Sequence, residues 1–179
     1  MARSNKSIYA ILGLLSRYKL SGYDIKGIMT KISSYYWSES NAQIYPTLKI
    51  LESKAYVTSK IDEASGARKK KIYAITPKGM LELKNWLNEP VKPSHYREEL
   101  LLKLSSSQHL PQTVIIKHFE EYKASILEQK KLQESYQDHI EHDHVGKPDQ
   151  RYLRMVYRHM DHILEAKLAW CEEMLSEME

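Results

Sequence analysis

The chain has 179 residues, of which 42% are hydrophobic and 28% charged, and this composition excludes a disordered or low-complexity protein. The apolar run at residues 8–15 is far shorter than the roughly 20 residues of a membrane span, and the single cysteine, Cys171, excludes an intrachain disulfide, so we expect a cytoplasmic protein. The net charge of +4 is uneven: residues 1–88 hold 15 Lys and Arg against 6 Asp and Glu, whereas residues 89–179 hold 12 against 17. The basic half predicts a polyanionic partner, which the acidic half is not expected to contact.

The first two helices are predicted from apolar residues at helical spacing, over residues 8–15 and 25–32. Between these runs, Ser21 and Asp24 have the spacing of a capping box, which satisfies backbone N–H groups at the start of a helix. We therefore expect the second helix to begin directly after Ser21.

The stretch ESNAQIYPTLKILESKAYV, residues 39–57, predicts a third helix that contains a proline. Its apolar residues recur at helical spacing, but Pro46 has no N–H group to bond the carbonyl four residues earlier. Because Ser40 or Asn41 is expected to cap this helix, the missing bond disturbs only the first turn. That turn is expected to present polar side chains such as Gln43 to solvent.

A β-hairpin and a fourth helix are predicted next. Residues 57–61 alternate between two faces, residues 72–76 form a second β-rich run, and DEASGARKKK between them predicts a loop with a basic return strand. Thr76 and Pro77 have the residue types of an N-cap and a first helical position. The segment NEPVKPS, residues 88–94, contains two prolines and is the predicted linker.

The second half is predicted to be helical, with two long helices separated by HVGKPD at residues 144–149. The apolar stripes of these helices are too wide for one partner helix to cover, which predicts a homodimer. The residues expected to form the dimer core lie on the last helix: Leu153, Tyr157, Met160, Leu164, Trp170, Cys171 and Met174.

Three helices, a hairpin and a basic loop in sequence are typical of a winged helix-turn-helix, whose third helix enters the major groove of DNA. The segments AILGLLSRYKLSGYDI, WSESNAQIYPTLKILESKAYV, KKKIYAITPKG and REELLLKL resemble the PadR family of bacterial transcriptional regulators, in its longer members with a helical C-terminal domain. The resemblance implies a homodimeric, DNA-binding repressor or activator that a small, commonly aromatic ligand releases from its operator. The predicted fold is mainly α with a small β-hairpin: a winged helix-turn-helix DNA-binding domain at 1–88 and a helical dimerisation and effector domain at 94–179.

The residues predicted to contact DNA lie near helix starts and in the basic loop. Gln43 has the amide chemistry that pairs with adenine, although a solvated glutamine at a helix start is the alternative. Tyr45 could donate its hydroxyl to a phosphate or pack against Trp37. Arg68 and Lys69 are favoured over the later lysines of their run for phosphate or minor-groove contacts. The full predicted set is Tyr23, Ser40, Asn41, Gln43, Tyr45, Lys49, Arg68, Lys69 and Lys70.

Two other interpretations stay open beside a ligand-responsive DNA-binding regulator. All eight histidines lie in the second half, and HIEHDH, which holds His139, His142 and His144, suggests a metal-responsive regulator, although the spacing has no zinc signature. A winged-helix adaptor that binds protein instead of DNA is the other alternative. No Ser, His and Asp set, phosphate-binding loop or spaced pair of carboxylates stands out, so we expect neither an enzyme nor a bound cofactor or metal.

Overall fold

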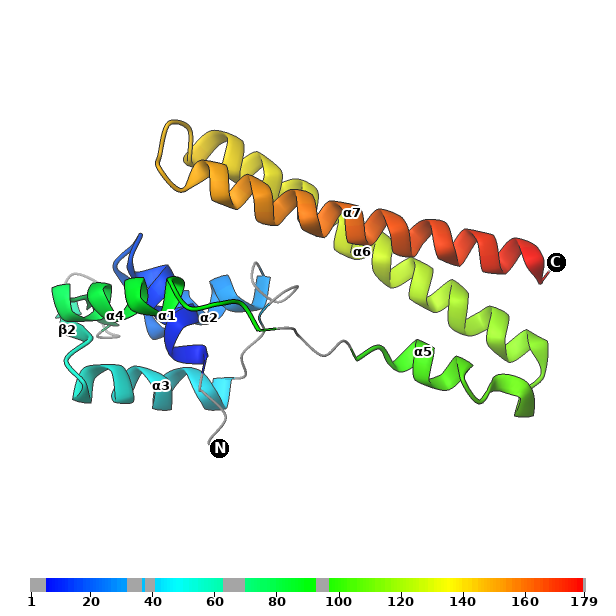
Figure 1. Cartoon of the computed structure of the whole chain (residues 1–179), viewed down its shortest axis with the longest axis horizontal. Coiled ribbons are helices and arrows are strands. Elements are labelled where there is room, and N and C mark those ends of the chain that lie inside the picture. The colour runs from blue at the N-terminus through cyan, green and yellow to red at the C-terminus, as the bar shows by residue number, and fades with distance from the viewer. Residues whose placement is uncertain (1–5, 32–36, 38–40, 63–69, 93–96, 179) are drawn as a thin grey trace. The chain divides into compact units, whose positions relative to one another are not determined.

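The computed structural model describes residues 6–31, 37, 41–62, 70–92 and 97–178, and the chain divides into two compact units, residues 1–92 and 93–179 (Figure 1). We call them the winged unit and the helical unit. The elements of the winged unit are α1 (Ser7–Leu15), β1 (Leu20–Ser21), α2 (Gly22–Lys31), α3 (Asn41–Ser53), β2 (Val57–Asp62), β3 (Lys70–Ile75) and α4 (Pro77–Leu87). Those of the helical unit are α5 (Glu99–Leu104), the 3₁₀ turn η2 (Ser107–His109), α6 (Gln112–Asp143) and α7 (Gln150–Glu177). The predicted fold class, mainly α with a small β-hairpin, is confirmed.

The sheet of the winged unit has three antiparallel strands in the order β1-β3-β2. Strands β2 and β3 form the predicted hairpin, with Asp62 opposite Lys70 next to the connecting loop. Strand β1, which the sequence did not predict, pairs Leu20 with Tyr73 on the other edge of β3. Two residues are too few to show an alternating pattern, so that only the pairing reveals this strand.

The core of the winged unit lies where α1, α2 and α3 meet. Side chains that are at most 1% exposed come from all three helices: Ile11, Leu12, Ile25, Met29, Ile44, Leu48 and Leu51. The last three are the predicted apolar face of the proline-containing helix, and burying each such side chain contributes about 1.5–3 kcal/mol. Helix α3 is therefore held by its inner face, and its outer face is left to solvent.

The predicted capping box at the start of α2 is confirmed. The Ser21 hydroxyl donates to Asp24 Oδ2 at 2.6 Å and accepts from the Asp24 N–H at 3.1 Å, while the Ser21 N–H donates to the same carboxylate at 3.0 Å. These bonds satisfy donors that the first turn of a helix otherwise leaves without partners. The sequence thus specifies where α2 begins.

The end of α3 is closed by a left-handed residue that is not glycine. Ala55 has a φ of 55°, its N–H donates to the Glu52 carbonyl at 2.9 Å, and the Tyr56 N–H donates to the Leu51 carbonyl at 2.9 Å. This pair of bonds is a Schellman motif, in which glycine is the usual left-handed residue. The chain leaves α3 in a fixed direction and enters β2 two residues later.

The start of α4 packs against this turn. The Tyr56 carbonyl accepts from the Thr76 N–H at 3.0 Å, and the Thr76 hydroxyl lies 2.8 Å from the Ala55 carbonyl and 3.1 Å from that of Tyr56. Thr76 also accepts from the Gly79 N–H at 3.0 Å, which confirms it as the N-cap. A β-carbon on Gly79 would lie 2.0 Å from the Tyr56 carbonyl oxygen, so only glycine fits at this position.

In the helical unit, α6 and α7 run side by side as an antiparallel pair (Figure 1). The buried residues of α6 recur every seven positions, at Phe119, Ile126, Gln133 and Ile140. The buried residues of α7 have the same spacing, which is typical of a coiled-coil seam, and they are Leu164 and Cys171. None of the helices in the described ranges is both long enough and apolar enough to span a membrane.

We expect the substitution Ala55→Gly to stabilise the winged unit. A left-handed L-residue costs about 1–2 kcal/mol, and the greater entropy of glycine in the unfolded chain offsets part of the gain, which leaves about 0.5–1 kcal/mol. Chemical denaturation measures the change in the free energy of unfolding. The control Lys54→Gly, one residue earlier, should be destabilising, and an Ala55→Gly protein no more stable than the parent would contradict the expectation.

Candidate nucleic-acid interface

The outer face of α3 presents three of the predicted DNA-contacting side chains to solvent. Gln43, Tyr45 and Lys49 are exposed, whereas the intervening residues Thr47 and Leu48 are 2% and 0% exposed. A helix fixed by one face, with polar side chains exposed on the other, is the arrangement that major-groove insertion requires.

Pro46 lies on the same exposed face, and α3 continues through it from Asn41 to Ser53. The proline cannot donate to the carbonyl four residues earlier. At the next position, the Thr47 hydroxyl donates to the Gln43 carbonyl at 2.6 Å. This side-chain bond adds a link between the first turn, which holds Gln43, and the buried part of the helix.

Tyr45 packs against the first residue of α2. A β-carbon on Gly22 would lie 2.7 Å from Cε1 of Tyr45, so the tyrosine ring occupies space that any other side chain would need. Tyr45 is still 51% exposed, and Tyr23, beside Gly22, is 70% exposed. The start of α2 thus adjoins the outer face of α3, and both tyrosines are accessible to a ligand.

Lys70, at the start of β3, lies in the same region. The pKa of Asp24 is lowered, first by the hydrogen bond from the Ser21 hydroxyl and to a smaller extent by the charge of Lys70. The pairing of β1 with β3 explains this proximity, because β1 leads directly into α2. The exposed side chains of Tyr23, Tyr45 and Lys70 are therefore grouped around the start of α2.

Lys71 differs from Lys70, because an ion pair engages its charge. Its Nζ lies 2.9 Å from Oε2 of Glu52 near the end of α3, and the Ser59 hydroxyl donates to the other carboxylate oxygen at 2.6 Å. The bond from Lys71 is the main cause that lowers the pKa of Glu52, and the same bond raises the pKa of Lys71. The contact fastens the hairpin to the end of α3 and leaves Lys71 less available to a phosphate.

The other predicted DNA contacts are not placed by the structure. Ser40, Arg68 and Lys69 lie outside the described residues, and Asn41 is described only as the first residue of α3. Sequence reasoning missed Gly22, which determines where the ring of Tyr45 can lie. A glycine directly before a predicted helix was the one signal that could have indicated it.

The predicted dimerisation residues differ in how far one chain covers them. Leu164 and Cys171 are 1% and 0% exposed, and burial raises the pKa of the Cys171 thiol. The remaining predicted residues are partly exposed: Leu153, Tyr157, Met160, Trp170 and Met174. Another set of apolar residues on α7, Tyr152, Val156 and Ile163, is 64%, 38% and 37% exposed. We call these three residues the outer stripe.

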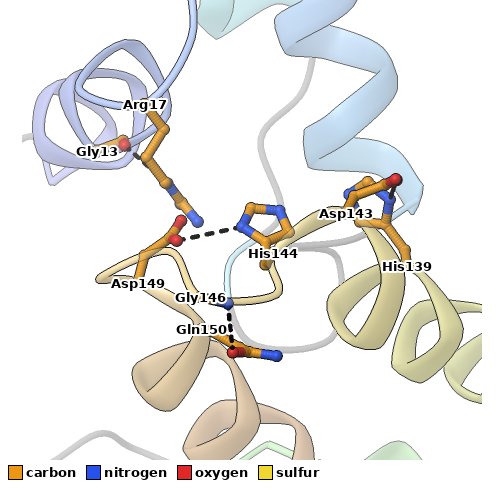
Figure 2. A network of polar contacts seen from close by, with 8 residues as sticks. All are labelled: Gly13, Arg17, His139, Asp143, His144, Gly146, Asp149 and Gln150. Carbon is orange, nitrogen blue, oxygen red and sulfur yellow. Dashed lines mark hydrogen bonds and ion pairs between the residues drawn. The ribbon is translucent and has the colours of Figure 1, made fainter.

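Histidines at the turn between α6 and α7 pair with carboxylates (Figure 2). His144 is 2% exposed and its Nδ1 lies 3.2 Å from Oδ1 of Asp149, while His139 pairs with Asp143 one helical turn away. In the part of the chain that the structure describes, no group of three or more His, Cys, Asp or Glu side chains could hold a metal ion. These contacts close the turn and give no support to the metal-responsive alternative.

Comparison with known proteins assigns each unit to a family model. Residues 11–85 match the transcriptional regulator PadR-like family, and residues 96–179 match the C-terminal model of virulence activator alpha. The negative transcriptional regulator PadR of Bacillus subtilis is 38% identical over 97 residues, and the match covers 53% of each chain. The chain thus spans about half the length of the curated relatives that it matches, 53% and 46%.

Two solved structures of Bacillus subtilis PadR are similar over nearly the whole chain. The complex with operator DNA has a TM-score of 0.81 at 27% identity and covers 97% of this chain and 99% of that one. The complex with p-coumaric acid has a TM-score of 0.72 at 28% identity and covers 95% and 96%. The similarity therefore extends over both units.

We expect Gly22→Ala to destabilise the winged unit by about 0.5–1.5 kcal/mol, because its methyl group would displace the half-exposed ring of Tyr45 from its position. In a Tyr45→Ala background the same substitution should cost less, since the ring is gone. Gly27→Ala is the control within α2: its β-carbon would meet nothing within 4 Å, and it should stabilise by up to about 1 kcal/mol. Chemical denaturation of these variants measures the coupling. An equal cost in both backgrounds would show that Tyr45 is not what requires glycine.

Proposed function

Because the chain belongs to the PadR-like family of transcriptional regulators, we propose that it regulates transcription in the cytoplasm by binding double-stranded DNA sequence-specifically. The observation that carries this proposal is the exposed polar face of α3 above a buried apolar face. Gln43 can pair with adenine N6 and N7 in the major groove. Tyr23, Tyr45 and Lys70, which are grouped around the start of α2, serve in this proposal as donors to phosphates, which position a protein without reading sequence.

We further propose that the protein is a repressor that a small aromatic or phenolic ligand releases from its operator. Support comes from PadR of Bacillus subtilis, which is a negative transcriptional regulator. Its solved structures that resemble this chain include a complex with operator DNA and a complex with p-coumaric acid. In a dimer, the two winged units must match half-sites about 34–36 Å apart or a multiple of this. A ligand that favours another spacing of these units would lower operator affinity.

The dimer forms, in this proposal, through the helical unit and uses the outer stripe of α7. Leu164 and Cys171 are already covered within one chain, whereas Tyr152, Val156 and Ile163 are exposed apolar side chains. At about 100° per residue, these three lie within about 40° of one another around the helix. Such a continuous apolar line is suited to pairing with its own copy across a two-fold axis.

We expect base reading and phosphate contact to be separable by mutation. Gln43→Ala should weaken binding to an operator selected from random duplexes by about 1–3 kcal/mol and leave a scrambled duplex nearly unaffected. Arg68→Ala or Lys69→Ala should weaken binding to both duplexes and reduce the slope of log K against log salt by about 0.9 for each phosphate that the protein no longer neutralises. Titration of both duplexes at several salt concentrations measures these effects.

Lys84→Ala is the matched control for the loop variants, because it removes an exposed cation from α4, and it should leave the salt slope unchanged. If Gln43→Ala weakens both duplexes equally, the first turn of α3 does not read a base. A protein with no salt-dependent affinity for any duplex would favour the adaptor alternative.

We expect Ile163→Asp to dissociate the dimer, because it places a charge within the outer stripe. Ala169→Asp places the same charge on an exposed position about 120° away around α7 and should leave the dimer intact. Sedimentation velocity distinguishes the two states. A dimeric Ile163→Asp protein would show that the interface lies elsewhere.

A further inference from the structure

Helix α3 carries a single acidic residue, Glu52, on the same side as two of the proposed DNA contacts. At about 100° per residue, Tyr45, Lys49 and Glu52 lie within about 60° of one another around the helix. Tyr45 and Lys49 are exposed, and the side chain of Glu52 is 27% exposed. A carboxylate on this line would repel the phosphates that the neighbouring side chains are proposed to contact, so its presence needs a reason.

Two side chains of the hairpin engage the two oxygens of this carboxylate. Lys71 Nζ lies 2.9 Å from Oε2, and the Ser59 hydroxyl donates to Oε1 at 2.6 Å. The bond from Lys71 is the main cause that lowers the pKa of Glu52, so the carboxylate is ionised at neutral pH. Ser59 lies opposite Tyr73, two residues after Lys71, so both donors project from the same face of the sheet.

Lys71 follows Lys70, which is one of the proposed phosphate contacts, but its charge is directed toward α3. Its Nζ lies 5.2 Å from the centroid of the Tyr73 ring as well as beside Glu52. The side chain of Lys71 is nevertheless 48% exposed. The ammonium group could therefore turn toward solvent if the carboxylate lost its charge.

The ion pair hinders phosphate binding even though a half-exposed pair contributes little to stability. A phosphate that takes Lys71 has to leave Glu52 as an unpaired anion beside the DNA backbone. The two negative charges then repel each other. Lys71 consequently gives a phosphate less net attraction than a lysine with no carboxylate beside it.

We propose that Glu52 limits the affinity of the winged unit for DNA of any sequence, because it withholds Lys71 from the phosphates. This inference rests on the proposed function and deepens it: Gln43 reads a base, and Glu52 sets how much sequence-independent attraction accompanies that reading. A protein that neutralises fewer phosphates binds non-operator DNA more weakly and depends less on salt. Glu52 acts through Lys71 and is therefore a positioning residue.

Titration of a scrambled duplex with the full chain at several salt concentrations tests the proposal. Glu52→Gln keeps an acceptor for Ser59 but removes the charge. This variant should bind about three- to tenfold more tightly at roughly 0.1 M salt, and its slope of log K against log salt should be steeper by about 0.9. Adding Lys71→Gln should return both quantities to near the parental values. Partial unfolding cannot imitate this result, because the expected change is a gain of affinity.

Glu82→Gln is the matched control, because Glu82 is a partly buried carboxylate of α4 that accepts from the Tyr9 hydroxyl at 3.1 Å. It changes the net charge by the same amount and should leave the slope unchanged. Three results would overturn the proposal: an unchanged slope in Glu52→Gln, a gain that persists in the double variant, or an equal gain in Glu82→Gln. These results contradict this inference alone, whereas a parent chain without salt-dependent affinity for any duplex contradicts the proposed function as well.

Discussion

The backbone carbonyl of Tyr56 is the point on which the arrangement of the winged unit depends. It accepts a hydrogen bond from the Thr76 N–H, follows the left-handed residue Ala55, and is approached so closely by Gly79 that no β-carbon fits there. The end of α3, the start of β2 and the start of α4 are thereby joined through backbone atoms. The position of α3 relative to the hairpin consequently depends on backbone hydrogen bonds at this point.

Ion pairs and polar contacts then decide which basic side chains remain available to the proposed DNA interface. Lys71 pairs with Glu52, and Lys78 donates its ammonium group to the Lys54 carbonyl at 2.9 Å. Both cations support the junction of α3 with its neighbours. Lys70, one residue before Lys71, is exposed and lies near the start of α2. The excess of positive charge in the first half of the sequence therefore overstates the number of cations that could contact phosphates.

Features determined by neighbouring residues were predictable from the sequence. The capping box of Ser21 and Asp24, the N-cap at Thr76 and the hairpin each depend on residues a few positions apart, so local patterns reveal them. Strand β1 and the contact of Tyr45 with Gly22 depend on packing between distant segments, which no local pattern encodes. The DNA contacts expected of Arg68 and Lys69 remain predictions.

Periodicity also could not tell which apolar face of α7 the chain covers by itself. The pattern correctly marked Leu164 as an apolar position, but it could not show that one chain already buries this side chain. Val156 and Ile163 have comparable hydrophobicity and remain exposed. The distinction arises from the register between α6 and α7, which is a property of the packed pair of helices.

Because Cys171 is buried, the reactivity of its thiol reports how often the helical unit opens locally. The thiol is inaccessible, and burial raises its pKa, so both access and ionisation protect it from alkylating reagents and oxidants. Modification then requires local separation of α7 from its surroundings, and with a fast reagent its rate follows how often that separation occurs. Because Cys171 is the only cysteine, labelling of the unmodified chain measures breathing of this helix pair without an engineered probe.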